Sequence, residues 1–201
     1  MPGGFLRVFA GGEKILELCE KTIERDYVFK GKVINVRRDT AQLPNGKLAN
    51  REVVEHTGGV TIAALTDDDE LLFVRQFRYP IGEVLMELPA GKLNVGEDPL
   101  AAAARELLEE TGAVARNFYD LGWIYTSPGY TTERLYLYAA DGLTFKGQHL
   151  DEDEFLDVLR VPLTEAVRHS ATGGYGDAKT DIAILRLDAL RRIGMPEPIH
   201  P

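Results

Sequence analysis

The sequence predicts a mixed α/β (α+β) protein, in which a mixed β-sheet lies between helices and a small antiparallel β section precedes it. Three observations support this fold class. The chain has 201 residues, of which 44% are hydrophobic and 27% charged, as in globular domains that bury a core without staples. Strand-like and helix-like stretches alternate along it. The alternation has no regular βαβ period, which favours a mixed sheet over a doubly wound parallel sheet.

The N-terminal section, residues 1–57, is predicted to consist of strands. Residues 1–13 are rich in glycine and are expected to be loose, and the stretch from 15 to 55 contains alternating and β-branched residues. Asn45-Gly46 within it is typical of a tight hairpin turn. Because this section has few large core residues for its length, we expect it to pack on a partner, namely a second copy of the chain in a homodimer.

The main domain is predicted at residues 58–193. Two buried strands, VTIAAL and LLFVRQF, are joined at the aspartates 67–69, and EVLMELPAG is a short strand that stops at Pro89. The later elements are a helix at 99–111, strands at 117–125, 134–140 and 155–161, a helix at LTEAVRHSA and a closing helix at DAKTDIAILRLDALRRI. The proline-rich tail, residues 194–201, is expected to fray.

Charge and composition exclude several classes of protein. The formal net charge is −9, so we expect no nucleic-acid-binding surface, because phosphate neutralisation requires clustered Lys and Arg. No stretch approaches the ~20 apolar residues of a membrane span. The N-terminus also lacks the basic start and apolar block of a signal peptide. The single cysteine, Cys19, rules out an internal disulfide framework and fits a cytoplasmic protein.

The helix at 99–111 has clear boundary signals. Asp98 suits the N-cap, Pro99 the first helical position and Gly112 the C-terminal stop. At ~100° per residue, one side of this helix is apolar and is expected to face the core. The residues on that side are Leu100, Ala104, Leu107, Leu108 and Thr111.

Three glutamates near the end of this helix, Glu106, Glu109 and Glu110, are predicted on roughly the opposite side. Glu106 and Glu110 form an i,i+4 pair of like charges, which is unfavourable by about 0.2–0.5 kcal/mol, and a helix C-terminus disfavours carboxylates. A solvated charged face is the ordinary interpretation of such a pair. Three carboxylates on one face, however, form a hard, oxygen-rich site suited to Mg²⁺ or Mn²⁺, and the metal would neutralise the repulsion.

The spacing of residues 91–112 resembles the Nudix box, the signature of hydrolases that act on nucleoside diphosphates linked to another moiety. The matching positions are Gly91, Glu97, Arg105, Glu106, Glu109, Glu110 and Gly112. The box usually ends in a bulky aliphatic residue and here ends in Ala113, a difference that concerns packing. The resemblance implies the Nudix fold and two or three Mg²⁺ or Mn²⁺ ions as cofactors. Gly91 is expected to let the backbone turn tightly before the helix.

The resemblance also implies a role for each residue of the metal site. Glu106 and Glu110 are expected to bind the metal directly, and Glu109 to bind it or to lie beside the ligands. The Ala90 carbonyl is expected to be a backbone ligand. Arg105 is expected to hold a carboxylate in place; the alternative for this residue is a plain surface ion pair, which would contribute little.

Two stretches outside the box resemble the ADP-ribose pyrophosphatase branch of the family. Ser127-Pro128-Gly129 follows the box, with the proline sixteen positions after its last glycine; by itself this tripeptide is simply a turn. Glu133 matches a residue that contacts the substrate or its water network in that branch. Arg78, before the box, matches an arginine that binds the pyrophosphate or ribose, a contact to which Arg is suited.

An acidic stretch, residues 151–154, precedes the last predicted strand. A run of charge is ordinarily a solvated loop, but in the ADP-ribose branch a loop here supplies the general base and an extra metal ligand. Glu152 or Glu154 is the candidate base, and Glu154, which matches more consistently, is also the candidate ligand. Arg51 and Glu52 stand where a contact across the dimer to the adenine side falls in that branch.

The resemblance implies hydrolysis of ADP-ribose to AMP and ribose 5-phosphate. The Gly-Asp-x-Lys-Thr run at 176–180 also occurs in nucleotide-sugar pyrophosphatases of the GDP-mannose type, so that substrate class stays open. A non-catalytic ADP-ribose-binding module is a third interpretation. The intact box argues against it, because such modules usually have eroded boxes.

Overall fold

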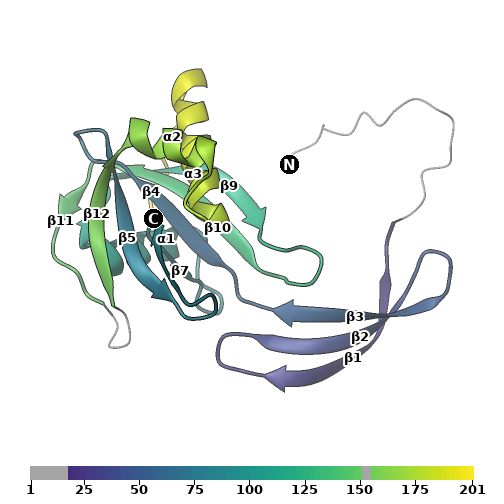
Figure 1. The fold of residues 1–201 in the computed structure, drawn as a ribbon. Coiled ribbons are helices and arrows are strands. Elements are labelled where there is room, and N and C mark those ends of the chain that lie inside the picture. The colour runs from purple at the N-terminus through teal and green to yellow at the C-terminus, as the bar shows by residue number, and fades with distance from the viewer. Residues whose placement is uncertain (1–17, 151–154) are drawn as a thin grey trace, which may run out of the picture. The chain divides into compact units, whose positions relative to one another are not determined.

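The computed structural model describes residues 18–150 and 155–201 (Figure 1). The chain divides between Val53 and Val54 into two compact units. The sequence predicts the start of the main domain at residue 58, a few residues later. Each unit is built around its own sheet or sheets.

The N-terminal unit is a three-stranded sheet in the order β1-β2-β3. Its strands are β1 Lys21–Lys30, β2 Asn35–Gln42 and β3 Leu48–Glu55, the last of which continues into the second unit. Between β2 and β3, Gly46 has a φ of 82° and the backbone N–H of Lys47 donates to Asn45 Oδ1 over 3.0 Å. The tight turn predicted at Asn45-Gly46 is therefore confirmed.

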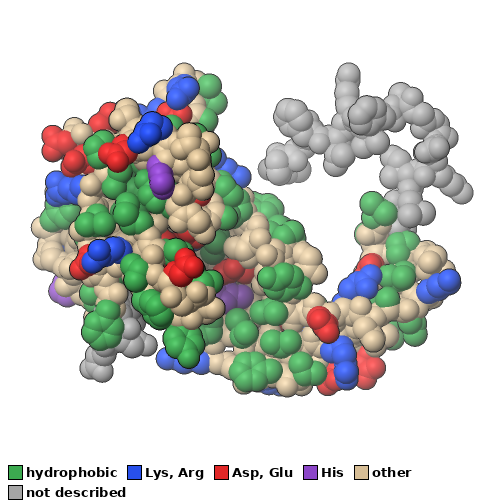
Figure 2. Space-filling view, viewed as in Figure 1, with side chains coloured by type: hydrophobic (Ala, Val, Ile, Leu, Met, Phe, Trp, Pro, Cys, Tyr) green, Lys and Arg blue, Asp and Glu red, His purple; other side chains and the backbone are tan. Residues whose placement is uncertain are grey.

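Large hydrophobic side chains of this N-terminal sheet are exposed. All ten residues of β1 are exposed, and Val28 and Phe29 are 57% and 54% exposed. Hydrophobic side chains accordingly gather on the visible surface of this sheet in Figure 2. The described residues of the unit include no helix to cover them. Exposed apolar surface of this kind is typical of docking faces, and the homodimer that would cover it stays a prediction.

The second unit contains a mixed four-stranded sheet in the order β7-β4-β10-β9. Its two inner strands run parallel, and its two outer strands are antiparallel to their neighbours. A second sheet, β12-β5-β6, is antiparallel, and β8 pairs with β11. The bounds are β4 Gly59–Ala64, β5 Glu70–Arg78, β6 Glu83–Glu87, β7 Ala90–Lys92, β8 Ala113–Val114, β9 Asn117–Tyr125, β10 Arg134–Asp141, β11 Thr144–Phe145 and β12 Leu156–Pro162.

Helices cover both faces of the four-stranded sheet. They are α1 Pro99–Thr111, α2 Leu163–Thr172 and α3 Ala178–Ile193. Because side chains alternate along a strand, β4 sends Ala63 into a core with α2 and α3 and Ile62 into a core with α1. Figure 1 shows α2 beside α3, apart from α1. The predicted mixed sheet between helices is therefore confirmed. No helix of the described residues is both long and apolar enough to cross a membrane.

The C-terminal segment differs from the expectation of a frayed tail at 194–201. Ile199 exchanges two backbone hydrogen bonds with Phe118 of β9, over 2.8 and 3.1 Å. His200 Nδ1 lies 3.1 Å from the carbonyl oxygen of Arg116. The pairing is possible because β9 is the outer strand of its sheet and Ile199, unlike the prolines around it, keeps a backbone N–H.

Candidate active site

Helix α1 carries the three glutamates of the predicted metal site, and the predicted capping residues fix its ends. The side chain of Asp98 accepts hydrogen bonds from the N–H groups of Leu100 and Ala101 over 3.0 and 3.1 Å. Gly112 has a φ of 70°, and its N–H donates to the carbonyl of Leu108 over 2.8 Å. These caps satisfy backbone groups that a helix end leaves unpaired, so the helix stops where the glutamates end.

Glu106 and Glu110 are buried, with 8% and 3% of each residue exposed, whereas Glu109 is half-buried. The prediction that all three glutamates lie opposite the core face is therefore wrong for two of them. The reason is that β7 covers this side of the helix. Glu110 Oε2 accepts a hydrogen bond from the Ala90 N–H over 3.0 Å, and Gly91 lies directly against Glu106.

Gly91 is needed for a close contact and not for a turn. It lies within β7 and has no positive φ, so the predicted tight turn at this residue is wrong. A Cβ at this position would lie 1.9 Å from Cδ of Glu106 and 2.1 and 2.2 Å from its two carboxylate oxygens. Only a residue without a side chain lets the carboxylate approach the strand so closely.

Arg105 ties several carboxylates of the box together. Its Nε and Nη2 donate to the two carboxylate oxygens of Glu97 over 2.9 and 3.0 Å. Its Nη1 donates to Glu106 and to Glu109, in each case over 2.8 Å. The hydrogen bond from Arg105, helped by the backbone N–H of Asn94, lowers the pKa of Glu97 to about 2, and the pKa of Arg105 is raised in turn. One guanidinium that holds three carboxylates differs from a plain surface ion pair.

A second group of charges lies at the ends of β5 and β6 and the start of α3. Glu87 is 1% exposed and accepts hydrogen bonds from Arg78 over 2.7 and 2.5 Å and from Lys179 over 2.5 Å. Lys179 also donates to Asp177 over 2.7 Å. Burial alone would raise the pKa of Glu87, but the hydrogen bonds and charges of Arg78 and Lys179 outweigh burial and lower it.

This second group is linked to the carboxylates of α1 through the chain after β6, because Ala90, whose N–H donates to Glu110, follows Glu87 by three residues. The pKa of Arg78 is raised, first by its hydrogen bonds to Glu87 and, among smaller causes, by the charge of Glu110. Arg78 therefore belongs to this second group, with Glu87 as its partner, and its predicted contact with the substrate stays a prediction.

Glu87 and Lys179 are site residues that the sequence does not predict. Lys179 belongs to the Gly-Asp-x-Lys-Thr run, which indicates a substrate class but does not by itself mark Lys179 as a site residue. Glu87 precedes the box and belongs to no motif. The available signal was a glutamate within the otherwise apolar strand of MELPAG, because a buried strand position seldom accepts a charge without a partner.

The two groups together carry more negative than positive charge. The cations are Arg78, Arg105 and Lys179, and the carboxylates are Glu87, Glu97, Glu106, Glu109, Glu110 and Asp177. Three cations therefore face six carboxylates, whose oxygens are the ligands that Mg²⁺ and Mn²⁺ prefer. Across 18–150 and 155–201, no three carboxylate, imidazole or thiol side chains converge closely enough to form a ready-made metal site. Glu106 and Glu109 turn toward Arg105, and Glu110 toward Ala90.

The loop between β9 and β10 contains four of the predicted substrate-binding residues, Ser127, Pro128, Gly129 and Glu133. One carboxylate oxygen of Glu133 accepts a hydrogen bond from Thr126 over 2.7 Å, and the other lies 3.4 Å from His56 Nδ1. His56 Nδ1 in turn accepts a hydrogen bond from the N–H of Gly58 over 3.0 Å. The backbone N–H of His56 donates to the hydroxyl oxygen of Thr132 over 3.0 Å, and this bond ties the loop to the segment just before β4, the strand that pairs with β7. No sequence motif marks His56.

Arg51 and Glu52 lie in the N-terminal unit. There the Nε and Nη2 atoms of Arg51 donate to the carboxylate of Glu20 over 2.9 and 2.6 Å. This ion pair lowers the pKa of Glu20. The predicted role of Arg51 and Glu52 across a dimer stays a prediction.

The two candidate bases, Glu152 and Glu154, lie outside the described residues. Just before them, the side chain of Gln148 donates to the backbone carbonyl of Glu110 over 2.6 Å. The N–H of His149 donates to the carbonyl of Glu109 over 3.0 Å. The chain that leads to the acidic stretch is therefore anchored on the C-terminal end of α1.

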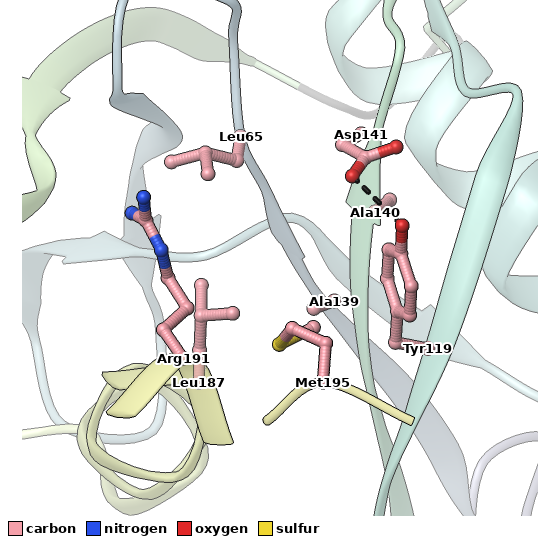
Figure 3. Close-up of a pocket in the computed structure, with 8 residues that line it drawn as sticks. All are labelled: Leu65, Tyr119, Ala139, Ala140, Asp141, Leu187, Arg191 and Met195. Carbon is pink, nitrogen blue, oxygen red and sulfur yellow. Dashed lines mark hydrogen bonds between the residues drawn. The ribbon is translucent and has the colours of Figure 1, made fainter. Parts of the chain in front are cut away.

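A cavity of about 160 Å³ lies beside α3 (Figure 3). At its edge the hydroxyl of Tyr119 donates to Asp141 over 2.9 Å, and burial together with this hydrogen bond raises the pKa of Tyr119. The lining residues are Leu65, Tyr119, Ala139, Ala140, Asp141, Leu187, Arg191 and Met195. None of them is a predicted site residue, so the carboxylates of α1 belong to a different part of the molecule.

Two family models match the chain. The NUDIX domain matches residues 55–180, and the nucleoside diphosphate sugar hydrolase N-terminal domain matches residues 20–54. The first match includes all of α1, β7 and the second group of charges up to Thr180.

Individual proteins also resemble this chain over most of its length. A protein of Bacillus subtilis (strain 168) named ADP-ribose pyrophosphatase is 42% identical over 83% of this chain and 91% of its own. The methanol dehydrogenase activator of Bacillus methanolicus is 41% identical over 82% and 90%. A GDP-mannose pyrophosphatase of Yersinia enterocolitica is 32% identical over 65% and 73%. A crystal structure of an ADP compounds hydrolase has a TM-score of 0.78, covering 90% of this chain and 99% of its own; at 22% identity it supports the fold alone.

Proposed function

This chain belongs to the Nudix hydrolase family, and on that premise we propose that it hydrolyses the diphosphate bond of ADP-ribose to AMP and ribose 5-phosphate. The observation that carries the proposal is the buried pair of Glu106 and Glu110, which α1 presents to β7 one helical turn apart. Like charges in a buried site require compensation, and cleavage of a diphosphate requires charge stabilisation. The name of the 42% identical relative supports ADP-ribose as the substrate.

Nudix ADP-ribose pyrophosphatases generally use divalent metal ions, and the carboxylate oxygens and excess negative charge of this site fit such a cation. We assign two or three ions of Mg²⁺ or Mn²⁺ to a ligand set that consists of the Ala90 carbonyl, Glu106, Glu109, Glu110 and Glu154. A divalent cation bound there would neutralise part of the negative charge of the diphosphate and would lower the pKa of water. Arg105 keeps Glu106 and Glu109 in place through its hydrogen bonds of 2.8 Å.

In the proposed reaction a water oxygen attacks one phosphorus, and the bond from that phosphorus to the bridging oxygen breaks. Arg78 binds a phosphate oxygen, a contact that its planar guanidinium favours. The carboxylate of Glu154 or Glu152 takes the proton of the attacking water, a step worth typically ~10²–10⁴-fold. The anchoring of Gln148 and His149 on α1 supports this role, because it brings the chain to the helix a few residues before the acidic stretch.

Substrate recognition is assigned to two further parts of the chain. The β9–β10 loop contributes Ser127, Pro128, Gly129 and Glu133. The N-terminal unit contributes Arg51 and Glu52 to the site of the second copy in a homodimer. The exposed hydrophobic side chains of β1 support this dimer, since burying them against the partner would remove apolar surface from water.

The substrate is tested by incubating the purified protein with Mg²⁺ and one of ADP-ribose, GDP-mannose, ADP-glucose, NADH or Ap4A. We expect AMP and ribose 5-phosphate from ADP-ribose at a higher kcat/KM than for the other four. A clear preference for another compound would overturn the substrate assignment.

The role of the buried pair is tested with Glu110→Gln, which keeps the shape of the side chain and removes its charge. We expect turnover to fall to background while the unfolding temperature stays close to that of the wild type. Glu165→Gln, the same substitution at an exposed position of α2, is the control and should keep full activity. Near wild-type hydrolysis by Glu110→Gln would show that the pair does not carry the chemistry.

A GDP-mannose-type pyrophosphatase is the second candidate. One observation favours it: Lys179, within the Gly-Asp-x-Lys-Thr run shared with that class, lies at the site against Glu87. The lower identity to the GDP-mannose pyrophosphatase favours ADP-ribose. A non-catalytic ADP-ribose-binding module is the third candidate, and measurable turnover of any substrate in the panel excludes it.

A further inference from the structure

The Gly-Asp-x-Lys-Thr run fastens the start of α3 to the end of β6. Asp177 caps the helix by accepting from the Thr180 N–H over 3.3 Å, and the Thr180 hydroxyl donates to Asp177 over 2.6 Å. The same hydroxyl oxygen accepts a hydrogen bond from the Leu88 N–H over 2.9 Å, and Thr180 is fully buried. The first turn of α3 is thereby bonded to the backbone two residues before Ala90.

Lys179 lies in this first turn and bonds two carboxylates. Its Nζ is 2.5 Å from Glu87 and 2.7 Å from Asp177. Its side chain is 13% exposed and that of Glu87 is 1% exposed. Because both groups are enclosed and bonded to each other, neither is placed to contact a diphosphate directly.

Arg78 is the member of this group that faces outward. Its side chain is 38% exposed, and Nε and Nη2 both donate to Glu87. Within the part of the chain that the structure describes, Nη1 donates no hydrogen bond. Two parallel hydrogen bonds fix the plane of a guanidinium, so Glu87 sets the direction in which Nη1 points.

The four charges alternate in sign from Asp177 through Lys179 and Glu87 to Arg78. If the positive charge of Lys179 were removed, Asp177 and Glu87 would repel each other. Among the described residues, Glu87 would then keep Arg78 as its only hydrogen-bonded cation. Arg78 would then be drawn more strongly to Glu87 and less to an anionic ligand.

We infer that Lys179 is a positioning residue, which acts through Glu87 to hold the guanidinium of Arg78 in place and leave Nη1 for a phosphate oxygen. The inference rests on the proposed function in that it requires a diphosphate substrate. It does not depend on whether that substrate is ADP-ribose or a nucleotide sugar.

A double-mutant cycle of Lys179→Met and Arg78→Ala tests this inference on whichever substrate the wild type turns over best. We expect Lys179→Met to lower kcat/KM by roughly ten- to hundredfold, mainly through KM, as for other misplaced binding groups. In the Arg78→Ala background, Lys179→Met should have no further effect, because the residue through which it acts is gone. Equal effects of Lys179→Met in both backgrounds would overturn the inference.

Two further variants show whether the effect is specific to a cation at position 179. Lys179→Arg keeps the positive charge and a donor to Glu87 and should restore most of kcat/KM. Lys47→Met, at an exposed site in the β2–β3 turn, is the matched control and should behave as the wild type. If Lys179→Met does not fold, Lys179→Gln, which removes the positive charge but keeps a polar side chain at this enclosed position, replaces it in the cycle.

A direct readout of Arg78 completes the test. The Nε–H signal of Arg78, assigned by its loss in Arg78→Ala, should exchange slowly with water in the wild type, because it is bonded to a buried carboxylate. It should exchange faster or shift in Lys179→Met. An unchanged signal would mean that Lys179 does not act on Arg78.

Failure of the wild type to cleave any diphosphate in the panel would instead refute the proposed function.

Discussion

Replacing Gly91 with alanine should displace the carboxylate of Glu106 while the fold survives. The added Cβ would lie 1.9 Å from Cδ of Glu106, and ordinary van der Waals contact begins near 3.4 Å, so the carboxyl group must retreat by about 1.5 Å. The clash is with the end of a side chain and not with backbone. The strand can therefore stay in place, and the change falls on Glu106 and on its hydrogen bond from Arg105.

The expected losses of stability and activity differ in size. Forcing one extra carbon into a packed site typically costs about 1–3 kcal/mol of unfolding free energy. A displacement of about 1 Å in a reacting group can lower the rate ~100-fold. We therefore expect Gly91→Ala to unfold only modestly earlier than the wild type but to lose at least ~100-fold in kcat.

Steady-state kinetics and thermal unfolding of the same preparations check this prediction. Gly194→Ala, beyond the far end of α3, is a suitable control, because its φ of 112° strains any side chain and yet no atom lies within 4 Å of the added Cβ. It should lose about 1–2 kcal/mol of stability and keep its kcat. Wild-type kcat in Gly91→Ala would refute the argument that the glycine exists to admit Glu106.

Three further predictions concern the charge cluster and the N-terminal sheet. Arg105→Lys keeps the charge but loses the forked geometry that reaches Glu97, Glu106 and Glu109, so kcat/KM in steady-state assays should fall roughly 10–100-fold. The pKa of Glu97 in the folded protein, about 2, lies below its ordinary value of 4.5, so its ion pair stabilises the fold fully above pH 4.5 and progressively less as the pH falls toward 2. Denaturant titrations between pH 5 and 2 should show this loss in the wild type and a smaller one in Arg105→Gln; equal losses would refute the assignment. Phe29→Glu places a charge on the exposed apolar surface of β1 and should convert a dimer into a monomer in gel filtration, whereas an unchanged elution volume would count against that interface.

The sequence predicts those features that depend on neighbours along the chain. Helix α1 is an example, because Asp98 and Gly112 act on backbone groups within a few residues of themselves. The hairpin turn at Asn45-Gly46 is another. The family resemblance adds the identity of the glutamates, since their spacing along one helix is itself local.

Features that depend on distant contacts could not be predicted in this way. Glu87 and Lys179 are separated by 92 residues, and only the fold brings them together. The function of Gly91 depends on a helix that begins later in the chain, so a turn was the natural but wrong expectation. Ile199 pairs with β9 because that strand has an open edge, which the tail sequence does not reveal.

The carboxylates buried between α1 and β7 are expected to bind a divalent cation and thereby to promote cleavage of a diphosphate. Anomalous diffraction from crystals grown with Mn²⁺ tests this claim most directly. We expect a peak within bonding distance of both Glu106 and Glu110, which disappears in crystals of Glu110→Gln. Well-ordered crystals with saturating Mn²⁺ and no peak beside these two residues would contradict the claim.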